Sequence, residues 1–112
     1  MKQEAIAIAE LRAREARTMT EKTFQAHIIQ RAKDSGWMVY HTWRSIHSAA
    51  GFPDLVLVRD TRIYYAEIKT ERGKLTPGQT AWRDALRLAG QETHVWRPSM
   101  WREIVEILEG TK

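Results

Sequence analysis

Apolar residues recur along the chain in two patterns, one helical and one typical of strands. Helical spacing predicts four helices, at residues 2–17, from Thr18 or Thr20 to Gly36, from Thr76 to Gly90, and from Ser99 to Leu108. Short apolar runs predict four strands, at residues 37–42, 55–58, 63–68 and 93–97. The order is helix, helix, three strands, helix, strand, helix. It predicts a mixed α/β domain with a central sheet.

Capping residues mark the start of two predicted helices. Thr76 can cap the third helix, with Pro77 at its first position and Gln79 completing a capping box. A second capping box is predicted at Ser99, with Glu103, at the start of the last helix.

The length of 112 residues fits one compact domain. Residues 1–19 are interpreted as an N-terminal charged helical arm, and residues 20–112 as the folded domain. The arm has only a thin apolar stripe. It is either a solvated extension or a segment that docks on a partner subunit or on DNA.

The composition and charge of the chain limit which kinds of site, location and partner can be expected. The chain has no cysteine, which excludes disulfides and thiolate metal sites. No signal peptide or membrane-length apolar run is found, so a soluble, cytoplasmic protein is expected. A formal net charge of +4 permits a polyanionic partner. The four histidines (His27, His41, His47 and His94) do not have the spacing of a zinc site.

The strongest chemical signal is Asp54, followed after twelve residues by Glu67-Ile68-Lys69. A hairpin centred between Asp60 and Thr61 places Asp54 directly opposite Glu67. Their Cβ atoms would then be about 5 Å apart. Lys69 projects from the same face as Glu67, because side chains alternate along a strand. The spacing therefore predicts a cluster of three charged groups.

Two opposed carboxylates on apolar strands repel each other unless a cation lies between them. Asp54 and Glu67, with the backbone carbonyl of Ile68, form an all-oxygen donor set that suits Mg²⁺ or Mn²⁺ better than zinc. Lys69 could then orient a water and stabilise a phosphodiester transition state. Taken separately, a Glu-x-Lys pair is usually a surface ion pair, and an Asp after Pro is usually a turn former. Their joint spacing favours the site.

These residues resemble a known family. Gly51-Phe52-Pro53-Asp54, Glu67-Ile68-Lys69 and Leu75-Thr76-Pro77-Gly78-Gln79 together resemble the virus-type replication-repair nuclease (VRR-NUC) domain of the PD-(D/E)XK nuclease superfamily. The likeness spans about residues 21–108. The narrower motifs before and after the core make this assignment more specific than the short PD…ExK core alone.

The resemblance implies a restriction-endonuclease-like core, with a central mixed β-sheet flanked by α-helices. It also implies Mg²⁺ or Mn²⁺ as cofactor and DNA as substrate. Stand-alone members are often phage-encoded and resemble Holliday-junction resolvases that act as homodimers on branched DNA. A two-fold dimer would suit so short a chain.

Three further residues are assigned to the site by this resemblance. The superfamily often has a glutamate on its first core helix, and this chain has Gln25 at that position, with Glu21 one turn earlier. Either residue could complete the site, Glu21 as a metal ligand, although Glu21 also suits a helix start. Gln79 belongs to the motif and supports the active site, but the capping box would also explain it.

DNA contacts are expected from the loops. Arg44, Ser45 and Ser48 precede the hairpin, and Lys74 follows it. An ordinary polar loop is the alternative at 44–48, and His47 is a weak candidate for a general base. The tryptophans are interpreted as core or dimer-interface residues rather than as base-stacking residues, namely Trp37, Trp43, Trp82, Trp96 and Trp101.

The sequence thus predicts a metal-dependent, structure-selective DNA endonuclease. A non-catalytic DNA-binding or scaffold protein on the same fold is one alternative. A sequence-specific restriction-type endonuclease is the other, although 112 residues leave little room for elements that read bases in the major groove.

Overall fold

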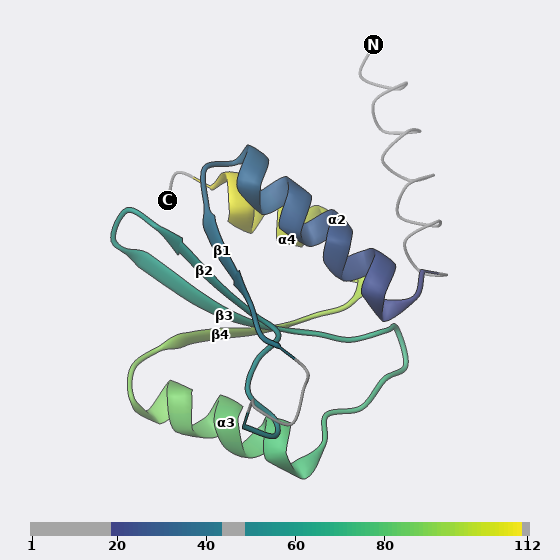
Figure 1. The fold of residues 1–112 in the computed structure, drawn as a ribbon, viewed down its shortest axis with the longest axis vertical. Coiled ribbons are helices and arrows are strands. Elements are labelled where there is room, and N and C mark those ends of the chain that lie inside the picture. The colour runs from purple at the N-terminus through teal and green to yellow at the C-terminus, as the bar shows by residue number, and fades with distance from the viewer. Residues whose placement is uncertain (1–18, 44–48, 111–112) are drawn as a thin grey trace.

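The computed structural model describes residues 19–43 and 49–110 (Figure 1). The elements follow the order α2 (Glu21–Asp34), β1 (Met38–His41), β2 (Leu55–Arg59), β3 (Arg62–Ile68), α3 (Pro77–Leu88), β4 (Glu92–Trp96), a 3₁₀ turn η1 (Pro98–Met100) and α4 (Trp101–Glu109). All four predicted strands and three of the predicted helices are confirmed. The helix predicted at residues 2–17 lies outside the described residues.

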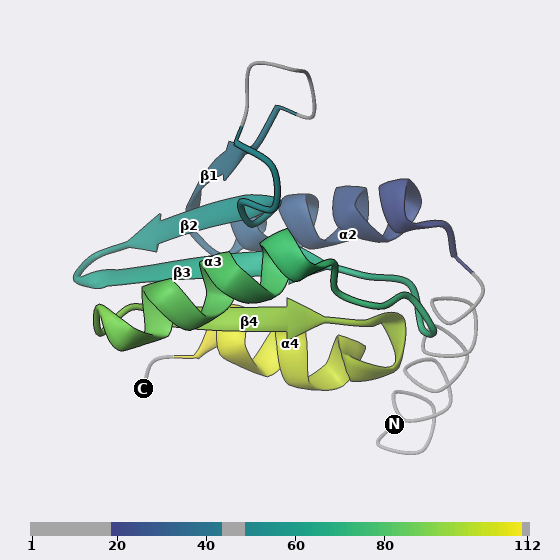
Figure 2. The same ribbon diagram turned by 90° about the horizontal axis from the view of Figure 1, so that it is seen from below.

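The four strands form one mixed sheet in the order β1-β2-β3-β4. The β1–β2 and β2–β3 pairs are antiparallel, whereas β3 and β4 run parallel. Helices α2 and α4 cover one face of this sheet, and α3 lies on the other (Figures 1 and 2). The predicted α/β class, with a restriction-endonuclease-like core, is confirmed.

The hydrophobic core fills the space between the sheet and the α2–α4 layer. Alternate residues of β2 and β3 point into it, as expected for strands with one face against helices. Its fully buried members are Phe24, Ile28, Ala32, Leu55, Leu57, Ala66, Ile68, Trp96, Ile104 and Leu108. Trp37 and Trp96 are therefore core residues, as predicted, whereas Trp43 is 69% exposed. Within the described ranges, no helix is long and apolar enough to cross a bilayer.

The β2–β3 hairpin has the register predicted from its apolar pattern. Val58 pairs with Ile63 and Val56 with Tyr65, and the ladder runs from Arg59↔Arg62 to Leu55↔Ala66. The connection is a two-residue loop, in which Asp60 has a φ of 54°. Aspartate is one of the few non-glycine residues that adopt this left-handed conformation readily.

Among the three α-helices of the described residues, two begin at a residue whose side chain caps them. The side chain of Thr20 accepts from the N–H of Thr23 at the start of α2, and the predicted capping box of Thr76 and Gln79 is formed at α3. The capping box predicted at Ser99 is wrong. Met100 occupies the cap of α4 without a side-chain cap bond. A capping box needs partners three residues apart, whereas Ser99 and Glu103 are four apart.

Candidate active site

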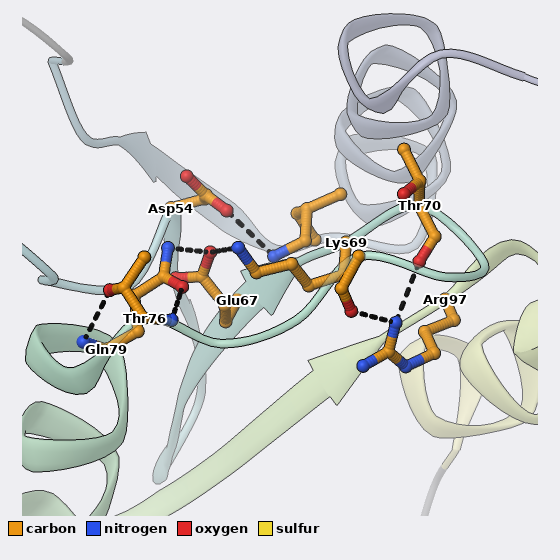
Figure 3. Close-up of polar contacts among 9 residues, drawn as sticks. Asp54, Glu67, Lys69, Thr70, Thr76, Gln79 and Arg97 are labelled. Carbon is orange, nitrogen blue, oxygen red and sulfur yellow. Dashed lines mark hydrogen bonds and ion pairs between the residues drawn. The ribbon is translucent and has the colours of Figure 1, made fainter.

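Asp54 and Glu67 lie side by side where the hairpin ladder ends. The last ladder pair is Leu55 with Ala66, so the next opposed pair is Asp54 with Glu67. Asp54 is 9% exposed and Glu67 is 7% exposed. The backbone N–H of Ile68 donates to Oδ2 of Asp54 at 2.8 Å and fixes that carboxylate (Figure 3). The predicted opposition of the two acids is confirmed.

The environment of Glu67 disfavours its negative charge. Burial raises the pKa of this carboxyl, and the charge of Asp54 and a hydrogen bond with Asp54 raise it further, to about 8. Lys69 acts in the opposite direction, and Glu21 contributes the smallest upward effect. Without a cation, the two carboxylates therefore share a site that disfavours two negative charges.

Lys69 projects toward Glu67 from two residues further along the chain. Its Nζ lies 3.9 Å from Oε2 of Glu67, and the residue is only 9% exposed (Figure 3). The backbone N–H of Lys69 donates to the carbonyl of Trp96 at 3.0 Å, which holds the end of β3 against β4. The three charged groups predicted from the spacing therefore form one buried cluster.

Gln79 contacts this cluster from the first turn of α3. Its Nε2 donates to Oε2 of Glu67 at 2.9 Å, and its Oε1 accepts from the backbone N–H of Thr76 at 2.8 Å (Figure 3). One amide thus completes the capping box and holds the carboxylate of Glu67. The predicted capping box is confirmed, whereas the support of an active site by Gln79 stays a prediction, for which the contact with Glu67 is the geometric basis.

Gly51 allows α3 to approach the hairpin this closely. Its φ is +90°, and a Cβ atom there would lie 2.3 Å from the carbonyl carbon of Gly78 and 2.7 Å from the nitrogen of Gln79. The next residue, Phe52, packs edge-on against Trp82 of α3, with ring centroids 5.0 Å apart. The Gly51-Phe52 step therefore docks the start of α3 beside Glu67.

The backbone of Asp54 is tied to the neighbouring strand. The N–H of Thr42, just beyond β1, donates to the carbonyl of Asp54 at 2.8 Å. The buried hydroxyl of Thr42 donates to the carbonyl of Pro53. These bonds extend the β1–β2 pairing to the residue that carries the carboxylate.

Gln25 lies on α2, one helical turn after Glu21. It is 6% exposed, and its Nε2 lies 2.7 Å from Nε2 of His41 on β1. Its Oε1 is buried and has no hydrogen-bond partner. Because Glu21 acts on the pKa of Glu67, this face of α2 lies within electrostatic reach of the carboxylate pair.

The loop that follows Lys69 is anchored by Arg97. Its Nη1 donates to the carbonyls of Thr70, Glu71 and Gly73 at 2.8, 3.3 and 2.6 Å. Figure 3 shows the contact with Thr70. Lys74, predicted to contact DNA, is exposed beyond this anchored stretch. The other predicted DNA contacts, Arg44, Ser45 and Ser48, lie outside the described residues, as does His47.

The oxygen atoms of the cluster determine whether it suits the predicted Mg²⁺ or Mn²⁺. Within residues 19–43 and 49–110, no three His, Cys, Asp or Glu side chains gather closely enough to hold a metal ion. Mg²⁺ needs fewer protein ligands, because it is usually held by one or two carboxylates and keeps several waters. Two contacting buried carboxylates fit that requirement, and the buried, unpaired Oε1 of Gln25 is a further oxygen on α2. They do not fit a structural zinc site.

Two residues beside the site were not found from the sequence. The spacing of the histidines excludes His41 as a zinc ligand, and the signal that marks it is a polar side chain at the end of an apolar strand. Arg97 had no distinguishing pattern, because its role depends on the fold of a loop more than twenty residues earlier. Both are defined by contacts between segments far apart in the sequence.

A comparison with protein-family models identifies the family of this chain. The family model described as the VRR-NUC domain matches residues 3–99, which includes most of the predicted arm together with every residue of the cluster. No curated protein matches this chain. The chain belongs to the VRR-NUC domain family, a family of nucleases.

Proposed function

We propose that this protein is a divalent-metal-dependent DNA endonuclease whose catalytic centre comprises Asp54, Glu67 and Lys69. The observation that carries the proposal is the buried Asp54–Glu67 pair at the end of one hairpin, with Lys69 on the same strand as Glu67. Such a pair is costly unless a cation or a proton relieves it. DNA is the substrate expected of a nuclease domain.

Asp54 and Glu67 would hold the cation, Mg²⁺ or Mn²⁺, together with the backbone carbonyl of Ile68. Each carboxylate has one oxygen fixed by an N–H group, from Ile68 and from Gln79 respectively. A divalent cation bound there would acidify a water and neutralise charge that develops on the phosphodiester. Gln25 would present a further oxygen, and Glu21 would add negative charge nearby.

Lys69 supplies a positive charge that does not depend on the cation. Its Nζ lies near the carboxylate of Glu67 and can donate to a phosphate oxygen or to the attacking water. Its burial strengthens these interactions, because there is less water to screen the charge. Lys69 therefore stabilises the transition state and orients the nucleophile.

Gln79 keeps the carboxylate of Glu67 in one orientation. Its amide is itself fixed by the backbone of Thr76, so it is a rigid donor. A carboxylate with one oxygen held in this way presents the other in a defined direction. Gln79 is thus a positioning residue for Glu67.

The substrate proposed is branched DNA, such as a flap or a Holliday junction. The family resemblance supports this, and so does the small size of the chain. The exposed Lys74 and the residues at 44–48 would contact the phosphate backbone, which gives affinity without reading sequence. A homodimer would bring two catalytic centres to the two strands of a junction. Residues 1–19 would form the charged arm predicted from the sequence.

Two other functions remain distinguishable by experiment. A non-catalytic DNA-binding or scaffold protein would bind DNA without cutting it, and a restriction-type enzyme would prefer one sequence in linear duplex. The intact Asp54, Glu67 and Lys69 favour catalysis, because a scaffold protein does not need them.

The test is cleavage of labelled linear, flapped and four-way-junction DNA in Mg²⁺, Mn²⁺, Ca²⁺ or EDTA. The wild type and Asp54→Asn are compared, and the mass of the protein in solution is measured in parallel. Cutting of branched DNA that requires Mg²⁺ or Mn²⁺ and is lost in Asp54→Asn supports the proposal. Binding without cutting in every metal favours the scaffold protein.

A further inference from the structure

The amide of Gln25 is held by His41. Nε2 of Gln25 and Nε2 of His41 are 2.7 Å apart. An amide nitrogen can only donate, so the ring nitrogen must accept. In this contact the ring proton of His41 therefore lies on Nδ1.

This contact sets the orientation of the whole amide. With the nitrogen turned to His41, the carbonyl oxygen of Gln25 points the other way. That oxygen is buried and has no partner, and a buried acceptor is normally paired. The arrangement therefore leaves an acceptor ready for a donor or a cation, and it keeps the NH₂ group away from that place.

Both residues are linked to the segments that carry the carboxylate pair. Gln25 follows Glu21 by one turn of α2, and the charge of Glu21 acts on Glu67. His41 pairs with Leu55, the residue after Asp54. The next residue, Thr42, donates its N–H to the carbonyl of Asp54. The Gln25–His41 contact thus joins α2 to the strand end that supports Asp54.

We propose that His41 is a positioning residue of the metal site, which acts by turning the oxygen of Gln25 toward the cation. The inference rests on the proposed function, since it concerns the same cation. A glutamate at residue 25 would present an oxygen in either orientation, but a glutamine presents one only when its nitrogen is held elsewhere. His41 binds the amide nitrogen of Gln25, so the amide oxygen is left to act as a metal ligand.

Metal affinity in the absence of DNA tests this directly. Mn²⁺ binding to the full chain is measured by titration calorimetry for the wild type, His41→Phe and His41→Gln. Phenylalanine removes the acceptor, whereas the amide oxygen of glutamine can take the place of the ring Nε2. We expect His41→Phe to weaken binding by about tenfold or more, in the range found when partners of metal ligands are removed. His41→Gln should recover most of that loss.

A second pair of variants, made in the Gln25→Glu protein, separates a positioning role of His41 from general damage to the metal site. In Gln25→Glu, adding His41→Phe should leave the Mn²⁺ affinity unchanged, because a carboxylate needs no orienting partner. His27→Phe is the matched control, since His27 is an exposed histidine of the same helix, α2, whose ring packs edge-on against Trp101 of α4. It should bind Mn²⁺ like the wild type.

The outcomes distinguish this inference from the function on which it rests. Wild-type affinity in His41→Phe, with binding lost in Asp54→Asn, overturns the role of His41 alone. An equal loss in the Gln25→Glu background also overturns it, because His41 would then act by another route. A wild type that binds no Mn²⁺ overturns both the inference and the proposed metal site.

Discussion

Gln79 and Glu67 are joined by a hydrogen bond of 2.9 Å between Nε2 of the amide and Oε2 of the carboxylate. The same amide accepts from the backbone of Thr76 through its oxygen. The start of α3 and the end of β3 are therefore coupled through one side chain. A single residue consequently contributes to both the stability of a helix and the geometry of the site.

The two contributions of Gln79 can be separated by comparing Gln79→Ala with Thr76→Ala. Both variants lose a capping interaction, and each should lower the free energy of unfolding by about 1 kcal/mol. Only Gln79→Ala also releases Glu67, so only it should slow cleavage at saturating metal, by about tenfold. Urea unfolding and single-turnover cleavage provide the two measurements. Equal cleavage rates in the two variants would show that Gln79 is only a capping residue.

The raised pKa of Glu67 predicts a pH-dependent stability in EDTA. The folded carboxyl titrates near 8, compared with 4.5 as its ordinary value. Between these values the folded protein holds a proton that the unfolded chain has lost. The free energy of unfolding should therefore fall as the pH rises from about 4.5 to 8, and then level off.

Glu67→Gln should remove this part of the pH dependence, since an amide does not titrate. Urea unfolding of both proteins between pH 5 and pH 9 provides the measurement. Cation binding should also strengthen in the wild type as the pH rises toward 8, because the cation and the proton compete for one carboxylate. Parallel stability curves for the two proteins would contradict the assignment of the raised pKa to Glu67.

Gly51 should tolerate substitution far less well than its contact partner Gly78. An alanine at residue 51 would require a left-handed conformation, and its Cβ would meet the backbone of Gly78 at 2.3 Å. Gly51→Ala should therefore cost about 2 kcal/mol or more and displace α3 from Glu67. Thermal unfolding and cleavage rates are the measurements.

Gly78→Ala is the matched control. A Cβ there lies at ordinary contact distance, 3.4 Å from the carbonyl oxygen of Ala50, and alanine favours the helix. Its stability should stay within about 1 kcal/mol of the wild type. A Gly51→Ala protein as stable and active as Gly78→Ala would contradict the close approach of α3 to the hairpin.

Arg97 should control the order of the loop after Lys69. Its Nη1 donates to three carbonyls of residues 70–73, and methionine would remove all three bonds. Arg97→Met should make trypsin cut after Arg72 or Lys74 about tenfold faster, because the loop opens more often. Arg102→Met, at an exposed arginine of α4, should leave the cutting rate unchanged. Equal trypsin cutting rates in Arg97→Met and Arg102→Met would show that Arg97 does not anchor the loop.

The hairpin was predictable because both of its strands carry a strong signal. Apolar residues on both sides of Asp60-Thr61 fix the register, since a slip of one residue would move every side chain to the opposite face. The opposition of Asp54 and Glu67 follows from that register, and Lys69 follows from strand alternation. The start of α3 was predictable from an equally local signal, because Thr76 and Gln79 are three residues apart.

Contacts between distant segments could not be predicted in this way. The bond from Gln79 to Glu67 depends on how closely α3 approaches the hairpin, which the conformation of Gly51 decides. The Gln25–His41 contact and the Arg97 anchor likewise depend on packing between elements. The capping box predicted at Ser99 was wrong because Ser99 and Glu103 are four residues apart, and the N–H of Ser99 donates instead to the carboxylate of Glu71, a contact between distant segments.

The central claim is that Lys69 acts in catalysis beside a metal held by Asp54 and Glu67. Its most direct test is single-turnover cleavage of a four-way junction by Lys69→Met, with junction binding and Mn²⁺ affinity measured on the same protein. Methionine retains the unbranched side chain as far as Cε but removes the ammonium group and its charge. We expect cleavage to fall by about 100-fold or more while the folded protein still binds the junction and Mn²⁺. Cleavage at the wild-type rate would contradict the claim and place the catalytic centre elsewhere.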